Sequence, residues 1–446
     1  MEKKILKTSD KKDYSRLGII LLCSLVYFVS YFSRKDFAAA MAGMLSENVL
    51  ARSTAGLIGT MMFVFYGTGQ LISGYLGDKI KPKYLIIIGL TTTGVCNLLM
   101  PIIPEGVMIA VWGVNGLAQA MLWPPIVKIL SRYLDHKTYV TANLVVSSAA
   151  HLATILLYVY VPICLSFMSW EAVFFTASII ALCSVVIFAV VMRIILPESV
   201  SKASDLVGKI EQSEIASKGE KGAKITHATP YKPNSSTQNK SIIEIFRDSG
   251  VLTVFVCIIV CGFLRDGIES WLPTLYSEAF GKGASESILV SVILPIFSIA
   301  SISLVTALHK NKLFGNEIVG SAILFAIALV CAVPLMIFVE LDGGFFAVAS
   351  LLLTALICAA MHGVNFLLIS CLPGRLSATG RAATVGGVCN SCVYIGAAIS
   401  TYGIAMLSQS LGWRSTIASW IALCALGIAF CFVSYKKYTA MLNADK

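Results

Sequence analysis

Residues 27–41 of this chain read YFVSYFSRKDFAAAM, and they decide how it must fold. They continue an apolar run that begins near Leu17, so the whole run is long enough for a helix that crosses a membrane. Arg34, Lys35 and Asp36 nevertheless lie inside the run. An unpaired charge at membrane depth is costly, so such side chains face a protein interior or a water-filled cavity. The stretch therefore predicts a membrane helix that lines a polar site within a helical bundle.

A second arginine occupies a similar position in the second half of the chain. Residues 261–273 read CGFLRDGIESWLP and contain Arg265. Because a guanidinium stays charged and can grip a phosphate or carboxylate with two parallel hydrogen bonds, the two arginines predict one central anion site. Two alternatives stay open: Arg34 could be neutralised by Asp36, and Arg265 could form an ion pair with Glu269 one helical turn later.

The composition identifies an integral membrane protein. Of 446 residues, 57% are hydrophobic and 13% are charged, whereas soluble domains carry about 25% charged residues. The net charge of +10 comes from Lys and Arg in alternate loops and the termini, which is the positive-inside pattern and not a nucleic-acid surface. The other loops carry acidic residues, Glu105, Glu278, Glu340 and Asp342. We therefore expect a multi-pass protein of the cell inner (plasma) membrane with both termini in the cytoplasm.

Apolar runs of about 20 residues predict twelve membrane helices, six before and six after a polar interval. They are expected at 17–40, 55–76, 84–103, 107–131, 139–165, 171–195, 249–275, 286–308, 317–339, 344–370, 382–408 and 413–434. The chain is thus predicted to be an all-α membrane protein with two six-helix bundles, 1–196 and 248–446, and a site at mid-membrane between them. The polar interval 197–247 is expected to be a cytoplasmic linker, and 241–248 a short amphipathic helix on the membrane face.

The face of the first helix that carries Arg34 also carries Tyr27 and Tyr31 at helical spacing. Hydroxyl groups on that face suit a wet cavity better than lipid. Lys35 points to a different face, so we expect it to pair with Asp36 or with another helix.

The loop after the second helix reads GYLGDKIKPK at residues 74–83. It is similar to the loop motif of the major facilitator superfamily, Gly-x-Leu-x-Asp followed by basic residues, although Lys81 stands where that motif usually has Gly. The similarity implies a role in conformational gating. The residues concerned are Gly74, Asp78, Lys79 and Lys83.

Residues 119–125 read QAMLWPP, and the two prolines predict a kink in the fourth helix. On its own this run fits an ordinary kink with a packed tryptophan, Trp123. Taken with the other motifs, it makes the chain resemble the organophosphate:phosphate antiporters of the major facilitator superfamily, which include glycerol-3-phosphate and hexose-6-phosphate transporters and phosphate-sensing relatives. The resemblance rests on four motifs: Tyr31-x-x-Arg34-Lys35-x-Phe37, Gly74-x-x-x-Asp78, Trp123-Pro124-Pro125, and Arg265 followed by Trp271-x-Pro273.

The resemblance implies that Arg34 and Arg265 hold a phosphate group, and that His151 corresponds to a site histidine of the family. A core histidine that bonds to a backbone carbonyl remains the alternative for His151. The chain departs from the family at Gln70, where a lysine is common. Neutral polar groups are added in helices ten and eleven, which favours a less charged or bulkier anion. The candidate substrate-binding residues are Tyr27, Tyr31, Arg34, Gln70, Trp123, His151, Arg265, His362, Asn365, Asn390 and Tyr394.

The sequence contains no P-loop and no recognisable metal-ligand cluster, and its five histidines are scattered. Cys389 and Cys392 have CxxC spacing, but on a predicted membrane helix they are expected to pack as small hydrophobes. We therefore expect no cofactor, no metal and no enzymatic activity.

The predicted function is gradient-driven transport of an organic anion, most simply a phosphate ester, by alternating access in exchange for inorganic phosphate, by a monomer. Two alternatives stay open. In a proton-coupled symporter of another organic anion or a sugar-like solute, Asp36, Asp266, Glu269 or His151 would carry the proton. In a non-transporting sugar-phosphate sensor, the chain would signal through a partner kinase.

Overall fold

The computed structural model describes residues 2–195, 250–375 and 382–444, and all regular secondary structure within them is helical. The predicted linker (197–247) and the predicted amphipathic helix (241–248) lie outside the described residues.

Six membrane-crossing units lie in the first described range. Their bounds are α1 Glu2–Ser46, α2 Arg52–Lys79, α3 Pro82–Leu99, α4 Glu105–Ala120 followed by α5 Trp123–Tyr133, α6 His136–Phe167 and α7 Trp170–Ile195. The break between α4 and α5 falls where the sequence predicted a kink. Pro124 and Pro125 stand in the first turn of α5, where a missing N–H breaks no intrahelical hydrogen bond.

Six further units follow from residue 251. Their bounds are α10 Val251–Phe280, α11 Ala284–Val290 followed by α12 Ile293–Lys310, α13 Glu317–Phe338, α14 Gly344–Asn365 followed by the π-helix η1 Phe366–Cys371 and α15 Leu372–Arg375, and α16 Ala382–Ala444. Gly412 interrupts α16 with φ 79° and ψ 176°. Glycine reaches positive φ without steric cost, so the two helices predicted at 382–408 and 413–434 meet at this residue.

The predicted all-α membrane fold is confirmed. Ten helices among the described residues are long and apolar enough to cross a membrane. Those ten count α16 once, although Gly412 divides it into two spans. They also omit α2, whose 28 residues extend over about 40 Å and pack against α4 and α16. With α16 counted as two spans and α2 included, the described residues contain the predicted twelve.

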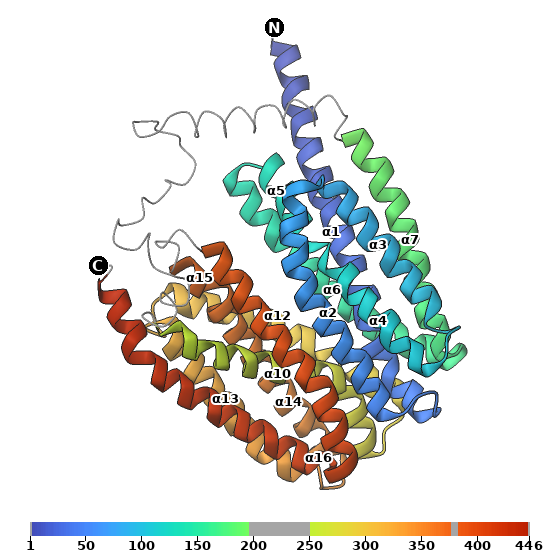
Figure 1. Cartoon of the computed structure of the whole chain (residues 1–446), viewed down its shortest axis with the longest axis vertical. Helices are drawn as coiled ribbons and strands as arrows, with labels where there is room; N and C mark the ends of the chain where they lie inside the picture. The colour runs from blue at the N-terminus through green and yellow to red at the C-terminus, as the bar shows by residue number, and fades with distance from the viewer. Residues whose placement is uncertain (1, 196–249, 376–381, 445–446) are drawn as a thin grey trace.

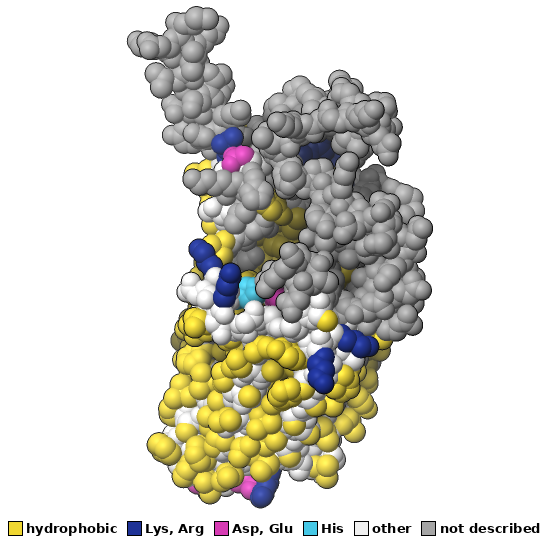
Figure 2. Space-filling view, turned by 90° about the vertical axis from the view of Figure 1, so that its left-hand side faces the viewer, with side chains coloured by type: hydrophobic (Ala, Val, Ile, Leu, Met, Phe, Trp, Pro, Cys, Tyr) yellow, Lys and Arg dark blue, Asp and Glu magenta, His cyan; other side chains and the backbone are white. Residues whose placement is uncertain are grey.

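The two sets of helices stand side by side, α1–α7 in blue to green and α10–α16 in yellow to red (Figure 1). Both chain ends lie on the side that carries α5 and α15. Apolar side chains cover most of the described surface in Figure 2, and charged side chains gather towards its two ends. Large exposed apolar residues such as Val330 and Phe432 are the expected lipid-facing surface of a spanning bundle.

The most extensive contact between the two halves joins α2 to α16. A Cβ atom added to Gly56 would lie 2.7 Å from Ala405 Cβ, so glycine lets the two backbones approach. Thr60 donates a hydrogen bond to the Ala398 carbonyl oxygen, 2.8 Å away. Nearer the start of α2, the Arg52 guanidinium contacts Glu278 at the end of α10. These contacts close the side of the molecule away from the chain ends.

Gly396 lets α16 pack closely on α10 and allows a first prediction. A Cβ atom at Gly396 would lie 2.0 Å from the Ile259 carbonyl oxygen, whereas one at Gly387, on the same helix, would meet nothing within 4 Å. We expect Gly396→Ala to lower the unfolding free energy by about 1–3 kcal/mol through overpacking. Gly387→Ala should leave it unchanged or raise it by up to about 1 kcal/mol. Thermal unfolding in detergent, followed by tryptophan fluorescence, measures both. Equal unfolding midpoints would contradict this packing.

Candidate functional site

A cavity of about 290 Å³ lies between the two halves and takes its lining from both. Nine of the eleven candidate substrate-binding residues line it. They are Tyr27, Tyr31, Arg34, His151, Arg265, His362, Asn365, Asn390 and Tyr394. Lys35, Asp266 and Glu269 also line it. Because these side chains come from α1, α6, α10, α14 and α16, the cavity exists only when the two halves are together.

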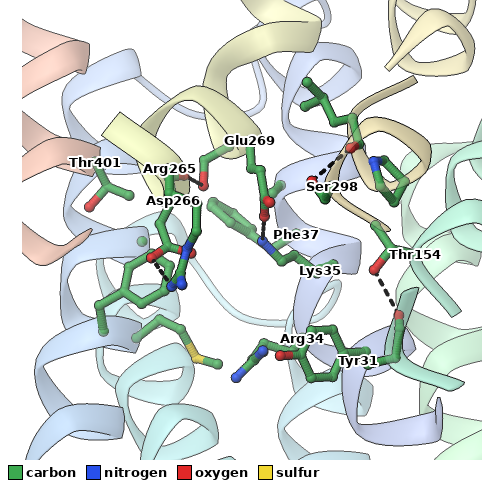
Figure 3. Close-up of a pocket in the computed structure, with 18 of the residues that line it drawn as sticks. Tyr31, Arg34, Lys35, Phe37, Thr154, Arg265, Asp266, Glu269, Ser298 and Thr401 are labelled. Carbon is green, nitrogen blue, oxygen red and sulfur yellow. Dashed lines mark hydrogen bonds and ion pairs between the residues drawn. The ribbon is translucent and has the colours of Figure 1, made fainter. Parts of the chain in front are cut away.

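Among the described residues that line the cavity, Arg34 is the Lys or Arg without a carboxylate partner. Its guanidinium carbon lies 4.2 Å from the centre of the Tyr31 ring and 5.0 Å from that of the Tyr66 ring, which are cation–π distances. In Figure 3 it extends beside Tyr31, and no dashed line joins it to another residue drawn. Within the described part of the chain, no carboxylate forms an ion pair with it. Asp36 is fully buried, accepts a hydrogen bond from the Phe37 N–H at 2.8 Å, and does not line the cavity.

Arg265 lies across the cavity and is held by two partners. It donates to Asp266 Oδ2 and to Asn365 Oδ1, each at 2.7 Å. The alternative pairing of Arg265 with Glu269 is therefore replaced by a pairing with the adjacent residue, Asp266. Two partners do not use all five N–H donors of a guanidinium, so Arg265 can still bind an anion while staying oriented.

Glu269 is instead the hub of a second polar cluster. Its Oε2 accepts from Lys35 Nζ at 2.5 Å, and its Oε1 lies 2.7 Å from His362 Nε2 and 3.8 Å from Cys358 Sγ. The hydroxyl of Tyr158 donates to the Glu269 carbonyl oxygen at 3.4 Å. Lys35 thus pairs with another helix, α10, and the pair joins the two halves, as Figure 3 shows.

The charges that line the cavity do not balance. Lys35 is paired with Glu269, and Arg265 with Asp266. Arg34 remains as a positive charge that no carboxylate of the described lining balances. A buried charge without a partner is unfavourable, so the cavity is electrostatically prepared for an anion placed between Arg34 and Arg265.

Aromatic rings hold Arg34 in place. The Tyr27 and Tyr31 ring centres are 5.1 Å apart, and those of Tyr66 and Tyr394 are 4.6 Å apart. Trp123 packs against Tyr27 with 4.7 Å between the ring centres and 37° between the ring planes. It lies behind that ring and does not line the cavity, so its contact with the site is indirect.

The remaining predicted residues have varied placements. His151 lines the cavity, and its Nδ1 lies 3.1 Å from the Ser147 carbonyl oxygen. The bond to a backbone carbonyl is therefore present, and a role of His151 in binding stays a prediction. Gln70 does not line the cavity. Lys83 lies over the Tyr84 ring, 5.1 Å from its centre, whereas the side chains of the other gating residues, Gly74, Asp78 and Lys79, are outside the described part of the structure.

Sequence reasoning missed three residues of this site, Tyr66, Tyr158 and Cys358. Tyr66 lies one helical turn before Gln70. The sequence therefore predicted the right face of α2 but named a residue one turn too far along the helix. Cys358 lies one turn before His362, and that i, i+4 spacing was the available signal for it. With Glu269, these two side chains place three metal-ligating atoms within 4.8 Å of one another.

Comparison with known proteins identifies the family. The family model described as Major Facilitator Superfamily matches residues 23–401. A probable hexose phosphate transport protein of Chlamydia trachomatis is 29% identical over 177 residues, which cover 39% of this chain and 38% of the relative. The membrane sensor protein UhpC of Escherichia coli is 36% identical over 110 residues, 25% of this chain and 23% of that protein. The glycerol-3-phosphate transporter of Bacillus subtilis is 25% identical over 280 residues, 61% and 60% respectively. The matched segments thus span less than two thirds of each relative's length.

Solved structures share the fold. A bacterial homologue of the human lysosomal transporter Spinster, in an inward-facing and unoccupied conformation, superposes with a TM-score of 0.70 at 12% identity, covering 96% of this chain and 98% of that one. The D-xylose–proton symporter gives 0.67 at 10% identity, covering 94% and 97%. At these identities the likeness concerns the fold alone.

Proposed function

The chain belongs to the major facilitator superfamily, and from this membership we propose that it carries a phosphate ester across the membrane by alternating access, in exchange for inorganic phosphate. Members of this superfamily transport solutes and do not convert them, so the chain is not an enzyme. Two of its relatives are named for hexose phosphate and glycerol-3-phosphate transport. These names support a small organophosphate as the solute.

The observation that carries the proposal is the unpaired Arg34. Its guanidinium faces the cavity with tyrosine rings as its neighbours. A phosphate group can accept two parallel hydrogen bonds from a guanidinium, and it would supply the missing negative charge. Arg265 lies on the opposite half with donors to spare. A phosphate between these two arginines would therefore be held by both halves at once.

The rest of the lining fits the body of a sugar phosphate. Asn365 and Asn390 offer amide donors and acceptors, and His151 and His362 offer imidazole nitrogens. The cavity has one surplus positive charge, which suits a phosphate monoester with a neutral, hydroxylated body. We propose a hexose phosphate as the first solute to test.

Exchange follows from the charge balance. When the cavity is empty, Arg34 has no counter-charge, and moving it through a dry intermediate would be unfavourable. When phosphate or a phosphate ester is bound, the charge is compensated and the halves can rock about the site. The empty carrier should therefore reorient slowly and the loaded carrier quickly, which is the behaviour of an antiporter.

The orientation and assembly belong to the same proposal. The positive-inside pattern assigns both chain ends to the cytoplasm of a plasma-membrane protein. The contacts between the halves close the opposite side, so this conformation opens towards the cytoplasm. Both arginines come from one chain, so a monomer suffices.

The test is uptake of labelled inorganic phosphate by proteoliposomes containing the purified protein. We expect rapid uptake into vesicles preloaded with phosphate or glucose 6-phosphate and little uptake into empty vesicles. If uptake does not depend on preloading but increases with an imposed pH gradient, the protein is a proton symporter and not an exchanger. No uptake from a folded protein that still binds a hexose phosphate would favour the sensor alternative, which has a relative in UhpC.

A further inference from the structure

Three donor groups of different chemistry meet at the edge of the cavity beside the Lys35–Glu269 pair. Cys358 and His362 lie four residues apart on α14 and therefore share one face. Glu269 reaches them from α10, with its Oε1 2.7 Å from His362 Nε2 and 3.8 Å from Cys358 Sγ. We propose that Glu269, Cys358 and His362 form a binding site for a soft divalent transition-metal ion, zinc above all, and that its occupancy arrests transport. The arrest rests on the proposed function, but the site itself does not.

The donor set selects the class of metal. Thiolate, imidazole and carboxylate are the ligands of zinc in proteins, and three of them with one open position make the usual accessible zinc site. Calcium and magnesium require several oxygen ligands, and here there is one carboxylate. The sulfur ligand favours zinc, cadmium or cobalt over the hard cations.

Burial and access also fit an ion. The Cys358 side chain is fully buried, and 16% of the Glu269 side chain and 14% of the His362 side chain are exposed. Because Glu269 and His362 line the cavity, an ion can arrive from the same space as the solute. The Cys358 thiol lies against Glu269 Oε1. When a metal ion binds, the thiol would release its proton to water in the cavity, and the resulting thiolate would coordinate the ion.

Metal binding would change the charge beside Lys35. Glu269 alone carries one negative charge, which pairs with Lys35. A divalent ion bound by this carboxylate and the Cys358 thiolate forms a neutral group. Lys35 would then lose its counter-charge, and the ion pair that joins α1 to α10 would weaken.

A fourth ligand is available from the other half. The ring centres of His151 on α6 and His362 are 6.5 Å apart. His151 Nδ1 is engaged with the Ser147 carbonyl oxygen, so its Nε2 is the nitrogen that can bind metal. A small rotation of this ring towards His362 would complete a tetrahedral site. An ion held by α6, α10 and α14 would tie the two halves together and prevent their rocking.

Cobalt binding to the purified protein tests the site without any transport. Cobalt(II) chloride should produce a thiolate-to-metal absorption band that zinc chloride removes, with one ion per chain. The band should be absent from Cys358→Ala and retained in Cys424→Ala, a control in which an equally buried cysteine of α16 is changed. His151→Gln should keep the band but weaken binding by at least about tenfold. No thiolate band in the wild type, or an unchanged band in Cys358→Ala, overturns the site.

Phosphate exchange with and without zinc chloride tests the arrest. For each variant, the exchange rate with zinc is divided by the rate of the same variant without zinc, so that differences in basal transport rate do not affect the comparison. Zinc should stop exchange by the wild type and by Cys424→Ala, and a chelator should restore it, whereas exchange by Cys358→Ala should resist zinc. Zinc inhibition that is equal in Cys358→Ala overturns the arrest. If the wild type binds cobalt through Cys358 but exchanges no phosphate, the metal site stands and the proposed function is wrong.

Discussion

Arg34→Ala is expected to abolish phosphate exchange while leaving the protein folded. Arg34 is the one Lys or Arg of the described cavity lining that has no carboxylate partner, so its removal takes away the charge that the proposed solute would neutralise. Truncating one partner of a buried, hydrogen-bonded charge pair costs about 2–5 kcal/mol. At about 1.4 kcal/mol per tenfold change, exchange at low phosphate should fall by at least about 30-fold. Initial uptake rates into phosphate-loaded proteoliposomes measure the loss.

Two further variants sharpen this test. Arg34→Lys keeps the charge but loses the planar fork that binds phosphate with two hydrogen bonds, so its rate should lie between the wild type and Arg34→Ala. Arg414→Ala removes an exposed arginine that pairs with Glu340 on the surface, and it should exchange phosphate normally. Wild-type exchange by Arg34→Ala would show that the surplus charge of the cavity has no part in binding.

Arg34 and Arg265 could be located from the sequence because a charge within an apolar run of about 20 residues is conspicuous. Each had to face inward, and two of them in corresponding helices had to meet. The twelve spans followed from the same apolar runs. Two of the breaks were also visible, since two prolines stand where α5 begins and Gly412 lies between the spans predicted at 382–408 and 413–434, whereas the break between α11 and α12 was not predicted.

The partners of the charged residues could not be predicted. Glu269 and Lys35 are separated by 234 positions, and nothing local shows how α1 and α10 are rotated about their own axes. For that reason the sequence favoured a pairing of Glu269 with Arg265, one turn away, and it included Asp36, which is buried and does not line the cavity. Tyr66 and Gln70 differ by one turn of α2, and only the packing of the helices decides which of them contacts Arg34, as Tyr66 does. Cys358 was one of 13 cysteines, most of them in apolar runs, and it became distinctive only beside Glu269.

The Lys35–Glu269 pair allows the second prediction of large effect. Its side chains are 10% and 16% exposed, so removing one partner leaves the other as a buried, uncompensated charge. Breaking such a pair costs about 3–5 kcal/mol. We expect Glu269→Gln to lower the unfolding midpoint most, because it leaves the Lys35 ammonium without the carboxylate that it contacts. Lys35→Met should cost less, since His362 still bonds to Glu269 Oε1.

The double variant Lys35→Met with Glu269→Gln separates charge balance from packing. Replacing both partners by neutral side chains of similar size removes the unpaired charge, so its unfolding midpoint should lie above that of Glu269→Gln alone. The exposed pair Arg414–Glu340 is the matched control: its side chains are 60% and 47% exposed, and surface pairs contribute about 0–1 kcal/mol, so Arg414→Met and Glu340→Gln should each change the midpoint little. If the effects of the Lys35 and Glu269 changes simply add in the double variant, the ion pair does not stabilise the contact between the two halves. If the double variant recovers, Lys35 and Glu269 act as one unit, and their ion pair stabilises the contact between α1 and α10.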